Sequence, residues 1–224
     1  MIEVREATKT YWKGGEEIRA ADALSLRADE GDLLVVHGPS GSGKSTLLLM
    51  IGGMLPPDAG AVVHDGEDIY RWSAGRRNRF RKHAVGFVFQ RFFLVPYLTV
   101  YDNVRVPLAL QGSRRDDREV IGLLAERLRI AHRLGHKPAE LSVGEQQRAA
   151  LARALAGEQK LILADEPTGN LDVENIEIIA ECLAEESRRG RTLVVATHDR
   201  QLLDIATGSL RIERGRIAAP AGSG

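Results

Sequence analysis

The stretch from Gly38 to Thr46 limits the possible folds more than any other part of the chain. It matches a pattern of one glycine, four free positions and Gly-Lys-Ser/Thr, between an apolar run of strand type at 33–36 and an apolar run at 46–51 that can open a buried helix. A glycine-rich turn that contains lysine by chance is the alternative, and this strand-loop-helix context disfavours it. Glycines let the backbone wrap closely around a phosphate, with N–H groups and the positive end of the helix dipole pointing at it.

The loop therefore predicts a nucleotide site, with Mg²⁺ as the companion of the phosphates. Lys44 adds a positive charge, and Ser45 can bring its hydroxyl to the Mg²⁺. The predicted nucleotide-binding residues of the loop are Gly38, Ser40, Gly41, Ser42, Gly43, Lys44, Ser45 and Thr46.

Length, charge and cysteine content narrow the class of protein. A chain of 224 residues suits one large domain, or one core with a smaller subdomain. Lysine plus arginine equal aspartate plus glutamate at 31 each, so no overall charge attracts nucleic acid, and we expect no nucleic-acid partner. Cys182 is the only cysteine, which excludes an internal disulfide and suits a reducing, cytoplasmic compartment. The N-terminus lacks a signal-peptide core, and the longest nearly apolar run, 47–57, is too short to span a membrane.

The first thirty residues alternate as strands do, which predicts an antiparallel sheet on either side of a polar loop. Tyr11 and Trp12 fall in this loop, where an aromatic ring can stack on a purine or serve ordinary packing. A second hairpin, 61–67, is predicted to turn at Asp65-Gly66 and to join the same sheet.

The middle of the chain predicts a helical insertion. The basic stretch 71–83 is compatible with nucleic-acid binding, but a solvated helix that leads into a buried strand at 85–89 explains it better. Gln90 ends that strand. The run from Phe92 to Leu98 is apolar, but proline interrupts it and it has no clean period, so it is a poor core strand. A helix from about Thr99 to Leu110 and two charged, amphipathic helices to about Leu134 are expected next.

Carboxylates and a histidine follow two predicted buried strands, at 161–164 and 192–197. Asp165 can hold Mg²⁺ and Glu166 can position an attacking water, because parallel strands deliver their carboxyl ends to one edge of the sheet. His198 after the second strand is either structural or a third polar group at this edge. Ser142 and Glu145 form a capping box, which marks either a plain helix start or an anion site.

In their order and spacing these motifs resemble the ATP-binding cassette family, the nucleotide-hydrolysing subunits of membrane transporters, over nearly the whole chain. The resemblance identifies 38–46 as the Walker A loop, 141–145 as the signature, 161–166 as the Walker B strand with the general base, and 170–172 as the D-loop. It implies ATP and Mg²⁺ as ligands. The implied catalytic residues are Glu166, His198, Lys44 and Gln90, the implied metal ligands are Ser45, Gln90 and Asp165, and the implied further ATP contacts are Tyr11, Ser142, Gly144 and Glu145.

The fold implied is an α/β P-loop NTPase in a single domain over 1–224. It has a mostly parallel, RecA-like core sheet, an N-terminal antiparallel β part at about 1–30 and 60–70, and a helical subdomain at about 91–156. The runs 86–90, 94–104 and 168–172 look most like one group, the ATPases of macrolide-efflux, lipoprotein-releasing, antimicrobial-peptide-resistance and cell-division complexes.

The resemblance further implies a head-to-tail homodimer that covers ATP through Ser142, Gly144 and Asp172. A transmembrane permease is expected to dock near Phe92 to Leu98, which would hold the protein at the inner face of the cell membrane. The expected function is to couple ATP-driven closure of the dimer to movement of the permease. Two alternatives are a cassette ATPase that regulates cell-envelope enzymes without moving a solute, and a soluble cassette protein of DNA repair or translation.

One residue departs from the family pattern. The signature usually reads Leu-Ser-Gly-Gly-Gln, whereas this chain has Val143 at the third position and Glu145 at the fifth. A β-branched valine disfavours a positive φ and narrows the approach to a phosphate. We expect Val143 at negative φ as the first residue of the signature helix, with Ser142 as its N-cap.

Overall fold

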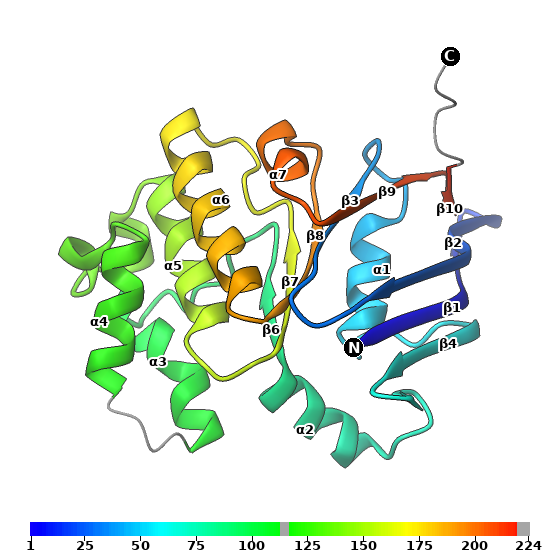
Figure 1. The fold of residues 1–224 in the computed structure, drawn as a ribbon, viewed down its shortest axis with the longest axis horizontal. Helices are drawn as coiled ribbons and strands as arrows, with labels where there is room; N and C mark the ends of the chain where they lie inside the picture. The colour runs from blue at the N-terminus through cyan, green and yellow to red at the C-terminus, as the bar shows by residue number, and fades with distance from the viewer. Residues whose placement is uncertain (113–116, 219–224) are drawn as a thin grey trace.

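The computed structural model describes residues 1–112 and 117–218, which form two sheets and a set of helices (Figure 1). The strands are β1 (Ile2–Lys13), β2 (Glu16–Ala28), β3 (Leu33–His37), β4 (Ala59–His64), β5 (Glu67–Asp68), β6 (Val85–Val88), β7 (Leu161–Asp165), β8 (Thr192–Ala196), β9 (Gly208–Glu213) and β10 (Arg216–Ile217). The α-helices are α1 (Lys44–Ile51), α2 (Ala74–Ala84), α3 (Val100–Gln111), α4 (Asp117–Arg127), α5 (Val143–Leu155), α6 (Val173–Arg188) and α7 (Arg200–Asp204). Two 3₁₀ turns are η1 (Ala131–Arg133) and η2 (Pro138–Glu140).

The larger sheet has the order β10-β9-β3-β8-β7-β6, and all of its pairs are parallel except β9 with β10. Strands β7 and β8 are buried along their whole length, which explains why their sequences are continuous apolar runs rather than alternating ones. Alternate residues of β7 reach the apolar cluster around α1 on one face and the cluster around α5 and α6 on the other. The predicted α/β class with a mostly parallel core sheet is confirmed.

The smaller sheet is antiparallel, with the order β2-β1-β4-β5. The hairpin of β4 and β5 turns at Asp65-Gly66 and joins the N-terminal strands, as predicted. The predicted polar loop around Tyr11 is wrong, because β1 continues to Lys13 and Tyr11 pairs with Ile18 of β2. Two glycines at 14–15, with φ of 61° and 88°, reverse the chain in a tight turn, so the polar residues on both sides remain in strands.

Helices α3, α4 and α5 lie together on the side of the molecule away from the antiparallel sheet (Figure 1). The basic stretch forms α2, which leads directly into β6, in agreement with the solvated-helix interpretation. The expected pair of helices up to Leu134 is only partly correct: α4 is a helix, but η1 is a single 3₁₀ turn, because the chain reverses at Arg129 with a φ of 52°. Ser113, after which this pair was expected to begin, lies outside the described residues.

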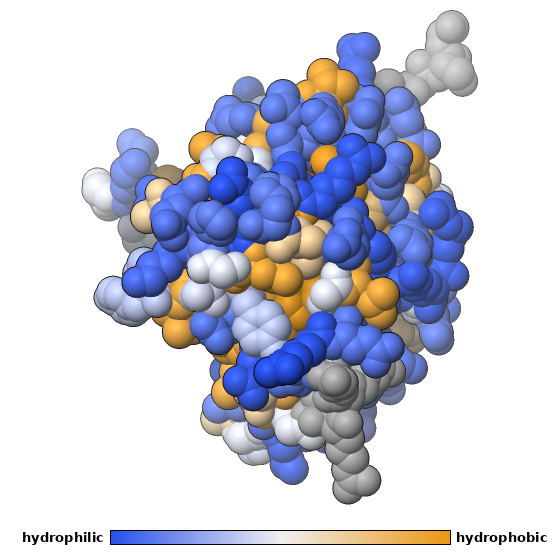
Figure 2. Space-filling model, turned by 90° about the vertical axis from the view of Figure 1, so that its left-hand side faces the viewer, coloured by the Kyte–Doolittle hydropathy of each residue, from blue (hydrophilic) through white to orange (hydrophobic). Residues whose placement is uncertain are grey.

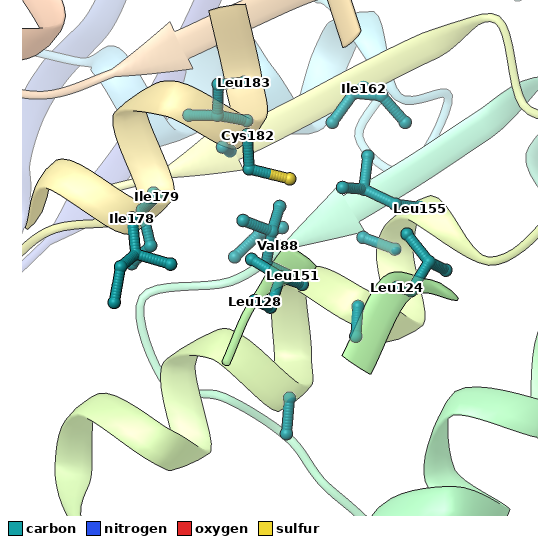
Figure 3. Packing of buried hydrophobic residues seen from close by; sticks show 14 of the residues in the cluster. Val88, Leu124, Leu128, Leu151, Leu155, Ile162, Ile178, Ile179, Cys182 and Leu183 are labelled. Carbon is teal, nitrogen blue, oxygen red and sulfur yellow. The ribbon is translucent and has the colours of Figure 1, made fainter. Parts of the chain in front are cut away.

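One apolar cluster joins these helices to the parallel sheet (Figure 3). In that view, leucines of α4 and α5 pack against α6 and against strands β6 and β7, and the thiol of Cys182 points into the same cluster. Burying a leucine side chain stabilises a fold by about 1.5–3 kcal/mol, so such contacts hold the helices firmly on the sheet. The labelled members are Val88, Leu124, Leu128, Leu151, Leu155, Ile162, Ile178, Ile179, Cys182 and Leu183.

In the described parts of the chain, no helix has the length and apolar character needed to cross a bilayer. The division into an antiparallel part, a helical part at about 91–156 and a core stays a prediction.

Candidate active site

The register of the parallel sheet brings the predicted site residues to one edge. Ala196 pairs with Val36 on one side and with Asp165 on the other, and Ala164 pairs with Val88. The residues that follow these pairs therefore leave the sheet at the same level. They are the glycine-rich loop after β3, Gln90 after β6, Glu166 after β7 and His198 after β8.

The glycine-rich loop needs glycine at both of its ends. At Gly38, with φ 143°, an added Cβ would lie 2.0 Å from the Ile212 carbonyl oxygen, and at Gly43, with φ 109°, it would lie 1.9 Å from that of Ala20. A side chain at either position would push the loop away from β9 or β2. Helix α1 begins directly after Gly43, so its free N–H groups face the concave side of the loop, which is a suitable environment for phosphate.

Lys44 is buried and directs its ammonium group into this loop. Its Nζ donates hydrogen bonds to the carbonyl oxygens of Gly38 at 2.8 Å and Pro39 at 3.2 Å. The same Nζ lies 3.8 Å from Oε1 of Glu166. The lysine thus joins the loop to the acidic end of β7, which the sequence alone placed 122 positions away (166 − 44).

Glu166 is the centre of the site. Its Oε2 lies 3.1 Å from Nδ1 of His198, and its Oε1 faces Lys44. Consecutive strand residues normally point to opposite faces of a sheet. Glu166 breaks this alternation with a left-handed φ of 47°, while its N–H still donates to the Ala196 carbonyl at 2.8 Å.

Asp165 fits the chemistry of a divalent cation. Burial raises the pKa of its carboxyl, a hydrogen bond with Ser45 opposes the shift, and the charge of Glu166 adds to it. Its Oδ1 is buried without a hydrogen-bond partner among the described residues. A cation bound to Asp165 would stabilise its ionised carboxylate and would give the buried Oδ1 a partner. The described residues hold no cluster of three or more histidine, cysteine or acidic side chains that could bind a metal ion.

The signature motif forms the predicted helix start. Ser142 caps α5, its Oγ accepts from the Glu145 N–H at 3.3 Å, and Oε2 of Glu145 accepts from the Ser142 N–H at 2.8 Å. Val143 is exposed, is the first residue of α5 and is absent from the residues with positive φ, as expected. Gly144 is buried, and an added Cβ would lie 2.5 Å from Oδ1 of Asn175.

Two of the predicted residues lie at the border of the site. Gln90 is exposed in the loop after β6. Tyr11 is partly exposed on β1, opposite Ile18, and Ile18 lines a shallow pocket together with Gly41 of the glycine-rich loop. Tyr11 therefore lies one strand away from the loop, although not in the loop of its own that the sequence predicted.

Several contacts of the site were missed in the sequence. Arg133 of η1 donates from Nε to Oε1 of Glu145 at 2.7 Å, and Arg148 of α5 hydrogen-bonds Asn175 of α6. Asn175 also donates to Oδ1 of Asp172, the N-cap of α6. Periodicity identifies the helices that carry these residues but not the side chains that meet between them, so no pattern in the sequence indicated these pairs.

A parallel sheet that delivers a phosphate-type loop and two acids to one edge defines a P-loop nucleotide hydrolase. Comparison with known proteins narrows this class, because a family model described as "ABC transporter" matches residues 21–169. The chain belongs to the ABC transporter family, in which it is an ATP-binding and ATP-hydrolysing subunit.

Named relatives support this assignment. The lipoprotein-releasing system ATP-binding protein LolD of Geobacter metallireducens is 42% identical over 98% of each chain. The macrolide export ATP-binding/permease protein MacB of Chlorobaculum tepidum is 38% identical over 97% of this chain, which corresponds to only 33% of that longer protein. Among solved structures, the dimeric ATP-binding cassette MJ0796 in a post-hydrolysis state bound to ADP and Pi matches with a TM-score of 0.91 and 35% identity, over 98% of this chain and 97% of that one.

Proposed function

We propose that ATP is hydrolysed at the edge of the parallel sheet, with Glu166 as the general base. The contacts of Glu166 with Lys44 at 3.8 Å and His198 at 3.1 Å carry this proposal, because they hold the carboxylate at the loop where the last phosphate of ATP would lie. In this position Glu166 orients a water molecule and accepts its proton. His198 keeps the Glu166 carboxylate aligned. When ATP binds, the Lys44 ammonium exchanges its hydrogen bonds to the loop carbonyl oxygens for hydrogen bonds to phosphate oxygens.

The remaining binding roles follow the arrangement of the loop. The N–H groups of 38–46 surround the phosphates and Tyr11 stacks on the adenine ring. Ser45, Gln90 and Asp165 would hold Mg²⁺, which neutralises phosphate charge when bound. The orphaned Oδ1 of Asp165 and its hydrogen bond with Ser45 support this metal site.

Glu166→Gln tests the catalytic proposal. Glutamine keeps the shape of the side chain but cannot accept the proton, so the hydrolysis rate should fall roughly a hundredfold or more, while ATP affinity measured by calorimetry stays within about twofold. Glu67→Gln, which changes an exposed glutamate on β5, is the control and should keep the full rate. Undiminished hydrolysis by Glu166→Gln would remove Glu166 from this role.

We propose that two copies of the chain close over ATP, each contributing Ser142, Gly144, Glu145 and Asp172 to the site of the other. Ser142 and Asp172 are both exposed, and they cap α5 and α6, which Arg148 of α5 links to Asn175 of α6. The dimeric state of the related cassette supports this arrangement. Size-exclusion chromatography of the Glu166→Gln variant with and without ATP tests this arrangement, because the variant should dimerise only with ATP.

We propose that the segment Phe92 to Leu98 receives a transmembrane permease, which keeps the protein at the cytoplasmic face of the cell membrane. Phe93 is 62% exposed and Tyr97 is 82% exposed, although both side chains are large and apolar in part. Figure 2 views the side of the molecule that carries α3 and α4, and apolar surface gathers in the middle of this face between hydrophilic residues. Such surface favours a docking role.

Serine at both Phe93 and Tyr97 tests the docking proposal. The variant should lose co-purification with the permease from native membranes and permease-stimulated ATPase, while its thermal stability and ATP binding stay unchanged. Leu123→Ser on α4 is the matched control, because Leu123 is also 62% exposed but lies outside the segment. Full permease binding by the double variant, or its unfolding, would contradict the proposal.

A further inference from the structure

The segment that we propose for permease docking has no regular secondary structure, yet its backbone is held at both ends by side chains of the neighbouring helices. At the far end, Asn103 of α3 is fully buried. Its Oδ1 accepts from the Val95 N–H at 2.7 Å, and its Nδ2 donates to the carbonyl oxygens of Val95 and Leu98, each at 3.2 Å. The backbone is thereby fixed while the side chains of Phe93 and Tyr97 stay exposed.

At the near end, Arg153 of α5 holds two successive carbonyl groups. Its Nη2 donates to the Phe92 oxygen at 2.8 Å and its Nη1 to the Phe93 oxygen at 2.5 Å. No carboxylate within residues 1–112 and 117–218 forms an ion pair with Arg153, and burial lowers its pKa. The guanidinium therefore donates its hydrogen bonds to the backbone of the segment.

The two bonds require a particular backbone conformation. Successive carbonyl groups of an extended chain point in opposite directions, so one planar guanidinium cannot bind both. Phe93 turns the chain with a left-handed φ of 46°, which is unfavourable for an aromatic residue unless other contacts fix it. Arg153 supplies such a contact.

The same turn is connected to Gln90. The ring of Phe93 lies edge-on to Phe89 with 5.2 Å between centroids, and Phe89 stacks on Phe87 of β6 at 4.1 Å. Gln90 lies between Phe89 and Phe93 in the chain. The contact between these two rings therefore closes a short loop around Gln90, and the hydrogen bonds from Arg153 hold the far end of this loop. Arg153 lies eleven positions after Ser142 (153 − 142), or about 16 Å along α5 at 1.5 Å per residue.

We propose that Arg153 is a positioning residue that ties the docking segment to the helix that begins with the signature motif. The inference rests on the proposed docking at Phe92 to Leu98. When the two subunits close on ATP and move α5, the segment moves with it as one body. Closure is thereby passed to the permease.

Arg153→Lys tests this role, because lysine keeps the charge but has no planar fork. Arg191→Lys is the control: Arg191 is also partly buried and also donates to two backbone carbonyls, those of Leu155 at 3.1 Å and Gly157 at 2.8 Å, away from the docking segment, and its Nε pairs with Glu186 as well. Hydrogen–deuterium exchange on the isolated full chain is measured first. Exchange of the Val95 amide, whose N–H donates to Asn103 within the held segment, should rise at least tenfold in Arg153→Lys and stay unchanged in the control.

Steady-state kinetics then separate positioning from a general structural effect. The isolated Arg153→Lys protein should keep its KM for ATP and its basal rate within about twofold, whereas stimulation by the co-purified native permease should fall at least fivefold. Wild-type exchange at the Val95 amide, or full stimulation, would overturn the proposal. Unfolding of both Arg153→Lys and Arg153→Met would make Arg153 a core residue and would overturn it as well.

Failure of the underlying docking proposal gives a different result. If the Phe93 and Tyr97 serine variant still binds and responds to the permease, docking at this segment is wrong, whereas increased exchange in Arg153→Lys would still identify the residue that holds the segment.

Discussion

Replacing Glu145 with glutamine tests how the signature helix of this chain is held. Burial alone would raise the pKa of Glu145, but hydrogen bonds from the Ser142 N–H and from Arg133 outweigh burial and lower it from 4.5 to about 2. At about 1.4 kcal/mol per pH unit, this shift corresponds to about 3 kcal/mol of stability at pH 7. Glutamine retains one acceptor oxygen, so one of the two charge-assisted bonds is lost and we expect a destabilisation of about 1.5–3 kcal/mol.

The effect should depend on pH in a defined direction. The folded-state pKa is depressed, so the stabilisation is fully present above about pH 4.5 and is lost as the pH falls towards 2. The difference between wild type and Glu145→Gln should therefore be constant between pH 6 and 8, within about 0.3 kcal/mol, and should fall to less than about half at pH 3.

Chemical unfolding followed by circular dichroism measures this difference. At pH 7 the melting temperature of the variant should also fall by about 3–12 °C, at roughly 2–4 °C per kcal/mol for a chain of this size. Glu140→Gln is the control, since Glu140 accepts from the Lys137 N–H at 2.6 Å in a second, exposed capping box. Its effect should stay below about 0.5 kcal/mol. Equal stability of Glu145→Gln and wild type at pH 7 would refute the reasoning.

Three further predictions concern the nucleotide site and the signature. Lys44→Ala should lower ATP affinity substantially in calorimetry, because it removes the ammonium group that faces the loop; unchanged affinity would contradict its role. Val143→Gly should leave the circular dichroism spectrum unchanged and raise the ATPase rate or leave it unaltered, because Val143 is exposed at negative φ; abolished activity would show that valine is required. Asp165→Asn should raise the melting temperature in EDTA at pH 7, because a raised carboxyl pKa means that the contribution of Asp165 to folding stability falls as the pH rises above 3.8. The same change should remove the stabilisation by Mg²⁺ with ATP. A loss of stability in EDTA would argue against the buried, unpartnered carboxylate.

The sequence was most informative where a local pattern determines a local structure. The glycine positions of the phosphate loop, the apolar run that ends in Asp165 and Glu166, and the spacing of Ser142 and Glu145 each predicted their element correctly. In these places neighbouring residues make the decisive contacts, so periodicity and capping rules are sufficient.

Contacts between distant elements were not predictable in this way. Arg153 binds carbonyl oxygens about sixty positions earlier in the chain. The sequence pattern of its helix would be the same if the Arg153 side chain faced solvent. The loop expected around Tyr11 was wrong for a related reason, because polar composition suggested a loop while two adjacent glycines allow a tight hairpin with exposed polar strands. Which long side chain meets which backbone group is decided by tertiary packing, and a single sequence carries no local signal for it.

The left-handed backbone of Glu166 lowers folding stability at the residue that we propose as the general base for ATP hydrolysis. A residue with a Cβ in this conformation costs about 1–2 kcal/mol, and glycine would not incur that cost. A chain selected only for thermostability would therefore tend to lose this glutamate, and with it the reaction. Libraries of variants screened for heat resistance should accumulate glycine or asparagine at position 166, whereas those screened for ATP turnover should keep glutamate and the less stable backbone.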